Sequence, residues 1–192
     1  MVDPLSIIAI GAAVGGAAGK LAEKAWDSSE VWLRERFGSH RQEAQQRARN
    51  NAAQFVQHLA IQVGVFEHDR RLSEDEIENE ESNPQFARLL EQTILNAAET
   101  NDESKHDLLA RLVANRLVSQ SETTLALASQ LSSDAIARST RRQLQLMALA
   151  CFLNEVRPRD PLQPADYRLW IQVFLRPFEE FHFMDIDARH LV

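Results

Sequence analysis

The feature that most restricts the fold of this chain is a set of glycines spaced four residues apart, Gly11, Gly15 and Gly19. They lie in the sixteen-residue stretch 4–19, whose only polar side chain is that of Ser6. Residues four apart share one face of a helix, and glycines on that face let another backbone approach closely. Each glycine costs about 1 kcal/mol of helix stability relative to alanine. We therefore expect a helix here that packs tightly against a partner.

Turn residues are scarce in the rest of the chain, and their scarcity favours an all-α fold. Only six glycines and six prolines occur among 192 residues, and four of the glycines lie between positions 11 and 19. Polar and apolar residues do not alternate between turn signals, as they would in half-buried strands. Apolar residues make up 44% of the chain, enough to fill a helical core. We predict an all-α protein without β-sheet, with an N-terminal αα-hairpin or small helical bundle and a C-terminal helical bundle.

Residues 1–66 are predicted to form a glycine-zipper helical hairpin. Pro4 suits the first turn of a helix, and the amphipathic pattern that follows the glycines would end at Gly38. Ser39 and Gln42 have the spacing of a capping box, which predicts the start of a second helix. Two helices joined by so short a connection lie antiparallel, so this part of the chain is predicted to be a hairpin.

The middle of the chain carries the excess of negative charge. Residues 65–107 hold four Lys or Arg against thirteen Asp or Glu, within a whole-chain net charge of −7. Six of these acids lie in residues 74–81. This distribution argues against nucleic-acid binding and indicates a solvated segment, so residues 67–83 are predicted to be an acidic linker or short exposed helix. As an alternative, this segment clamps the basic residues of the second helix, Arg41, Arg47 and Arg49.

Residues 84–192 are predicted to form the C-terminal helical bundle. Its helices are expected at 84–100, 105–119, 122–131, 133–156 and 164–176. Residues 144–153 are apolar on almost every side, so we expect this helix at the centre of the bundle, with Cys151 as a buried, inert thiol. A single cysteine excludes an intrachain disulfide and fits a cytoplasmic protein. The apolar end of the chain leads us to expect that the natural protein continues past Val192.

The sequence holds no catalytic or metal-binding constellation, so we expect no enzyme, no cofactor and no metal. There is no His-Glu-x-x-His, no cysteine pair and no phosphate loop. Arg34 with His40, and Arg176 with His182, loosely match the Arg-to-His spacing of the all-α HEPN ribonucleases, in which such a pair handles the scissile phosphate. This spacing turns the two side chains to different sides of a helix. RNA cleavage is therefore only the third hypothesis.

Membrane or oligomer contact is the leading interpretation of the first helix. At about 1.5 Å per residue its sixteen residues reach about 24 Å, short of the ~30 Å hydrocarbon core, so a lone span is not expected. The predicted contact residues are Gly11, Gly15, Gly19, Ile7, Ile8, Val14 and Trp26. Trp26 equally suits a helix core, and the glycine seam equally suits packing against other helices of the same chain.

The first 26 residues resemble the start of Bell and HeLo-like domains. They comprise the opening Met-Val-Asp-Pro-Leu-Ser-Ile-Ile, the glycine and alanine run, and the segment Lys-Leu-Ala-Glu-Lys-Ala-Trp that ends at Trp26. Those domains are N-terminal helical bundles of bacterial and fungal immune receptors, and the resemblance covers about the first 65 residues. It implies a cell-death effector whose first helix is released, oligomerises and damages the membrane. Separately, the segment from Lys105 to Leu117 and the surrounding residues 84–192 are similar to bacterial all-α proteins akin to the Abi-alpha abortive-infection family.

From these patterns and resemblances we expect a non-enzymatic, membrane-targeting or oligomerising effector of bacterial anti-phage defence. It would self-associate, bind no nucleic acid, and be cytoplasmic or peripheral to the inner membrane, and the sequence does not identify a protein partner. The alternative is an intracellular helical protein-interaction module in which the glycine seam is core packing.

Overall fold

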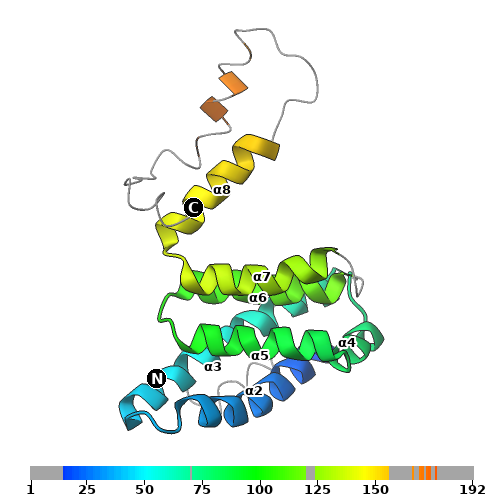
Figure 1. The fold of residues 1–192 in the computed structure, drawn as a ribbon. Coiled ribbons are helices and arrows are strands. Elements are labelled where there is room, and N and C mark those ends of the chain that lie inside the picture. The colour runs from blue at the N-terminus through cyan, green and yellow to red at the C-terminus, as the bar shows by residue number, and fades with distance from the viewer. Residues whose placement is uncertain are drawn as a thin grey trace. The chain divides into compact units, whose positions relative to one another are not determined.

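The structure, a computed structural model, describes residues 15–69, 71–119 and 124–155 together with a few positions between 166 and 176. Within these residues it contains seven helices and no strand, so the prediction of an all-α fold is confirmed (Figure 1). The helices are α2 (Gly16–Phe37), α3 (Gln42–His68), α4 (Glu74–Glu81), α5 (Pro84–Ala98), α6 (Glu103–Val118), α7 (Thr124–Arg138) and α8 (Arg141–Glu155). The chain divides into two compact units, residues 1–137 and 138–192.

The first two described helices, α2 and α3, form an antiparallel hairpin, drawn in blue to cyan in Figure 1. The predicted capping box of Ser39 and Gln42 is wrong, because α3 begins at Gln42 and no side chain caps it. The connection between α2 and α3 is instead stabilised by a side chain from the first turn of α3. The side-chain amide of Gln45 donates to the carbonyl oxygens of Gly38 and His40, at 3.0 and 2.8 Å. These bonds satisfy backbone groups that the end of α2 leaves open.

One hydrophobic core joins the helices α2 to α6, and α3 contacts α2, α5 and α6 within it. Phe55, Leu59 and Val63 of α3 are fully buried. Burial of each such side chain contributes about 1.5–3 kcal/mol. The hairpin expected over residues 1–66 and the helices that follow residue 84 share this core, since the compact unit continues to Ala137.

The acidic segment folds as the short helix α4 and is attached to the core by one side. Its start carries a capping box, in which the Glu76 N–H donates to Ser73 Oγ at 3.3 Å and the Ser73 N–H donates to Glu76 Oε2 at 2.8 Å. Ile77 and Glu80, three residues apart on one face, are 1% and 8% exposed. The acids between these two buried positions and on the opposite face are exposed, so the segment is solvated on one side only.

Helix α7 runs without interruption through the pair Ser132–Ser133, where the sequence predicted a break. The Ser132 hydroxyl donates to the Ala128 carbonyl oxygen at 2.7 Å. The hydroxyl of Ser133 is buried, 3.2 Å from that of Thr93, and accepts from the Asn96 amide at 3.1 Å. Serine favours helix ends because its hydroxyl competes for backbone groups. Here the Ser132 hydroxyl bonds back to the carbonyl four residues earlier and the Ser133 hydroxyl binds distant side chains, so neither serine ends the helix.

In the second unit, α8 starts where Thr140 and Gln143 form a reciprocal capping box, with N–H to side-chain oxygen distances of 2.7 and 3.2 Å. The prediction that this helix is buried on all sides with an inert Cys151 is wrong for the residues that the structure describes. Gln143 is the buried residue of α8, whereas Cys151 is exposed and Leu153 is 61% exposed. A helix is buried only where neighbours cover it, and its own composition does not supply them.

Candidate functional site

The predicted contact residues fall into two groups at the start of α2. Outside the described residues lie Ile7, Ile8, Gly11 and Val14. Gly15 directly precedes α2 with a φ of +67°, and the φ of Gly16 is +58°. A right-handed helix cannot continue through two residues with positive φ. Gly15 and Gly19 therefore do not belong to one unbroken helical stripe.

The other group, Gly19 and Trp26, lies inside the bundle. Trp26 is 8% exposed and belongs to the core cluster, and Gly19 is buried. Their small neighbours Ala17 and Ala18 are 2% and 0% exposed. The small-residue face of α2 is thus occupied by contacts within this chain.

A carboxylate from the end of α3 closes on the first turn of α2. The Ala17 N–H donates to Glu67 Oε1 at 3.1 Å and the Ala18 N–H donates to Glu67 Oε2 at 3.2 Å. The first N–H groups of a helix have no partner inside it, and the positive end of the helix dipole favours an anion. Gly16 makes room for this contact, because a Cβ atom there would collide with the Glu67 carboxylate. We call the two hydrogen bonds the Glu67 clasp.

Two ion pairs continue this contact along α2. Lys20 pairs with Glu74 and Lys24 pairs with Glu81, so the acidic helix α4 contacts α2 through both lysines. The hydrogen bond and charge of each carboxylate raise the pKa of its lysine. Among the described residues, the ion pairs of α4 join it to α2 and α6, which does not support the alternative in which the acidic segment clamps Arg41, Arg47 and Arg49 of the second helix. Arg49 pairs with Glu30 of α2.

A neighbouring face of α4 makes a buried ion pair with α6. Arg116 Nη2 lies 2.8 Å from Glu80 Oε1, and the two side chains are 2% and 10% exposed. Asn83 donates its side-chain amide to the same carboxylate oxygen at 3.0 Å, and Arg116 Nη1 donates to the Ser119 carbonyl oxygen at 3.2 Å. Burying two charges is costly, and these additional bonds offset part of that cost.

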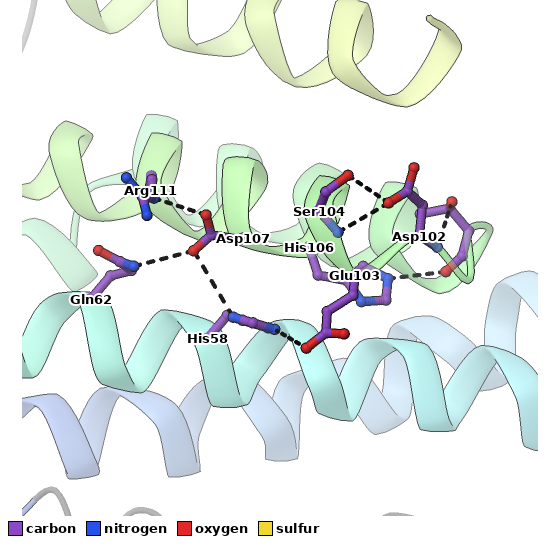
Figure 2. Close-up of polar contacts among 9 residues, drawn as sticks. His58, Gln62, Asp102, Glu103, Ser104, His106, Asp107 and Arg111 are labelled. Atoms are coloured by element: carbon purple, nitrogen blue, oxygen red, sulfur yellow. Dashed lines mark hydrogen bonds and ion pairs between the residues drawn. The ribbon is translucent and has the colours of Figure 1, made fainter. Parts of the chain in front are cut away.

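A polar cluster joins α3 and α6 on the same unit (Figure 2). The ring nitrogens of His58 lie 3.9 Å from Glu103 Oε1 and 4.0 Å from Asp107 Oδ1. Gln62 donates its amide to Asp107 Oδ1 at 3.2 Å, and Arg111 Nε lies 2.9 Å from Asp107 Oδ2. The carboxylate of Asp107 is therefore engaged on both oxygens and links the two helices.

Beside this cluster, the His106 side chain binds backbone carbonyl groups at the C-terminal end of α5. The ring is fully buried, and its Nε2 lies 3.1 Å from the Ala97 carbonyl oxygen and 2.9 Å from that of Thr100. Burial lowers the pKa of His106 below its usual value, so the ring is neutral near pH 7. An Nε2–H facing two carbonyl oxygens acts as donor, and it adds a further donor to the Ala97 carbonyl oxygen, which also accepts from the Thr100 N–H at 3.2 Å. The arrangement is a helix cap.

The geometry of the described residues offers little for catalysis. Within them, no group of three or more His, Cys, Asp or Glu side chains could hold a metal ion. Arg34 and His40 are both exposed at the end of α2, and the His40 ring packs edge-on against Phe37 with the ring centroids 5.5 Å apart. His182 of the second Arg-to-His pair lies outside the described residues. Across the described stretches, no helix is long and apolar enough to cross a bilayer.

Sequence reasoning missed the acids that matter most here, Glu67 and Glu80. Glu80 lies three residues after Ile77, the apolar residue of the acidic segment, and this spacing places both on one helix face. That signal could have identified Glu80 as the inward-facing acid. Glu67 has no comparable signal, because its partners are backbone groups fifty positions away in the chain.

A protein-family model matches residues 19–192, and the function of that family is uncharacterised. No curated protein and no solved structure matches the chain. The matched region begins inside α2, at the buried Gly19, and covers every later helix, whereas Gly11 and Gly15 precede it. The chain belongs to this uncharacterised family.

Proposed function

We propose that this chain is a non-enzymatic effector that assembles at a membrane through its apolar residues 4–14, with the bundle of residues 16–137 as their carrier. The observation that supports this most is the burial of the small-residue face of α2. Because Ala17, Ala18 and Gly19 pack inside the bundle, we assign contact with a membrane or with further copies to the sequence upstream of Gly16.

The sequence of this segment suits assembly better than a lone span. Residues 4–14 read Pro-Leu-Ser-Ile-Ile-Ala-Ile-Gly-Ala-Ala-Val, eleven residues with Ser6 as the polar side chain. Even as a helix, this length extends only about 16 Å, about half of the ~30 Å hydrocarbon core. Several copies side by side, or a copy lying in the interface, would bury the apolar surface. The resemblance to Bell and HeLo-like domains links such assembly to bacterial defence.

Leakage of a trapped dye tests the proposal. The full chain is added to vesicles of phosphatidylethanolamine and phosphatidylglycerol, and release is compared between the parent and the variants Ile8→Asp and Gly15→Leu. A charge in the apolar segment opposes burial in lipid, so we expect Ile8→Asp to reduce leakage at least tenfold. Gly15→Leu places a branched side chain in the glycine seam through which copies would pack, and we expect a similar loss.

Ile61→Asp is the matched control, because Ile61 is 46% exposed on α3, in the bundle that carries the segment. Its leakage should equal that of the parent, and circular dichroism should show the same helix content in all four proteins. No leakage from the parent, or leakage that Ile8→Asp leaves unchanged, would contradict the proposal.

The burial of Gly19 and its neighbours also favours a second candidate, an interaction module in which the glycine seam is core packing. This candidate predicts that the chain binds no vesicles and that Gly15→Leu changes stability alone. Sedimentation of the chain with and without vesicles separates the two candidates, since only the membrane effector moves into the lipid fraction.

A further inference from the structure

A cavity of about 180 Å³ opens where α2, α4 and α5 meet, on the bundle of residues 16–137 (Figure 1). Most of its wall is apolar. Leu21, Phe86 and Leu90, which are 1%, 1% and 7% exposed, form this wall together with the half-buried Trp32. A cavity of about 150 Å³ with such a lining holds a benzene ring. The volume here therefore suits one apolar group of that size.

Two charged side chains border the cavity, Lys24 of α2 and Glu81 of α4, and they form an ion pair. The Glu81 side chain is 14% exposed, whereas that of Lys24 is 63% exposed. The lysine ammonium is thus largely in water, and such a pair is weak. The covered carboxylate keeps its place at the cavity when the flexible lysine side chain turns into solvent.

The charge around the cavity favours a cation over an anion. Glu81 is the last residue of α4, whose eight residues include six acids and no base. The C-terminal end of a helix also carries partial negative charge, which attracts cations. A carboxylate that is largely removed from water interacts with a cation more strongly than an exposed one does. The cavity therefore combines an apolar wall with a border suited to one positive charge.

We propose that this cavity binds a small amphipathic amine. Its apolar group, the size of one aromatic ring, contacts Trp32 and Phe86, and its ammonium group pairs with Glu81 in place of Lys24. The site lies within residues 21–90 of the bundle and does not depend on the proposed membrane function.

Three ligands of nearly equal size test the proposal on the full chain: phenethylamine, the neutral 2-phenylethanol and the anionic phenylacetate. Amide NMR titration measures each dissociation constant and locates the site through the shifts of Ala25, Ser28 and Ala87, which line the cavity. We expect phenethylamine to bind at least fivefold more tightly than 2-phenylethanol, because only the amine pairs with Glu81. Phenylacetate should bind more weakly than both.

Substitutions at the ion pair separate the charge from the apolar wall. Glu81→Gln removes the carboxylate, so phenethylamine and 2-phenylethanol should then bind equally. Lys24→Gln removes the competing ammonium and should tighten phenethylamine binding at least threefold. Lys20→Gln is the matched control, because that lysine lies about one turn earlier on α2, pairs with Glu74 and is not among the residues that line the cavity. Its affinity for phenethylamine should equal that of the parent.

A further variant, Ala87→Leu, fills the cavity from an exposed position on α5, so the bundle should fold as before. We expect it to weaken the binding of both phenethylamine and 2-phenylethanol at least fivefold. Circular dichroism checks that every variant keeps the helix content of the parent.

The proposal is overturned if the parent binds phenethylamine and 2-phenylethanol equally, or if none of the three ligands gives a saturable shift. A preference for the amine that survives Glu81→Gln, or shifts that fall outside the cavity, would overturn it as well. Tighter binding in Lys24→Gln but not in Lys20→Gln supports competition between the amine and Lys24, and an unchanged affinity in Lys24→Gln contradicts it.

Discussion

The glutamates of α4 that face α6 and those that face α2 differ greatly in their exposure to solvent. Toward α6, Glu80 forms an ion pair with Arg116 in which the side chains are 10% and 2% exposed. Toward α2, Glu74 pairs with Lys20, and these side chains are 50% and 59% exposed. The comparison shows that an acid-rich helix is not uniformly a solvated one. One of its acids is a structural part of the core.

Loss of an exposed ion pair and loss of one partner of a buried ion pair change the free energy of unfolding by different amounts. An exposed ion pair competes with water and is worth about 0–1 kcal/mol. A buried pair has lost its hydration, so removing one partner leaves an uncompensated charge and costs about 3–5 kcal/mol. We therefore expect loss of one partner of the Glu80 pair to destabilise the protein more than loss of either lysine.

The largest effect is expected for Arg116→Leu. This substitution leaves the carboxylate of Glu80 buried without its cation, and we expect a loss of about 3–5 kcal/mol in the free energy of unfolding. Urea denaturation followed by circular dichroism measures it. The double variant Arg116→Leu/Glu80→Leu removes both charges and should recover most of the loss. A loss below about 1 kcal/mol for Arg116→Leu would place this pair with the exposed ones.

His106 extends the comparison to a buried group that is neutral. Its pKa is lowered in the folded state, so as the pH falls below about 6.5 the unfolded chain takes up a proton that the folded protein resists. Stability should therefore be fully present above pH 6.5 and decrease as the pH is lowered from there. Urea midpoints between pH 7.5 and 5.5 measure this slope.

His106→Gln should reduce this slope and cost about 1–3 kcal/mol at pH 7.5, because it removes the imidazole N–H that faces the Ala97 and Thr100 carbonyl oxygens. His58→Gln is its matched control, since that imidazole lies near the same helix but faces Glu103 and Asp107. If His106→Gln retains the whole slope of the parent, another group is responsible for it.

The smallest effects are expected for Lys20→Gln and Lys24→Gln. Each removes an exposed charge from the contact with α4, and we expect little change in the free energy of unfolding. The effects should also shrink in 0.5 M salt, where exposed charges are screened. A salt-independent loss of more than about 2 kcal/mol would show that the two sides of α4 are energetically alike.

Features that depend on a few neighbouring residues could be predicted from the sequence. Helix α5 begins at Pro84 as predicted, because Asn83 caps it by accepting from the Gln85 N–H at 2.9 Å. The end of α2 at Gly38 was predicted on the same grounds. Such signals are complete within one turn of the chain, so they need no knowledge of the tertiary structure.

Features that depend on distant partners could not be predicted. Ser133 continues α7 because Thr93 and Asn96, about forty positions earlier, satisfy its hydroxyl. Cys151 lies in an apolar run and is nevertheless exposed. At the candidate site, the sequence identified Gly19 as a residue of close packing, but its packing partners are set by the assembled bundle.

The Glu67 clasp also makes the length of α3 matter. Each residue of a helix advances it by about 1.5 Å and rotates it by about 100°, so one inserted residue between Gln42 and Glu67 would turn the carboxylate away from α2. The bonds to Ala17 and Ala18 thus form only when both arms of the hairpin have matching lengths and rotations. The contact therefore depends on the helical register of α3 along its whole length from Gln42 to Glu67.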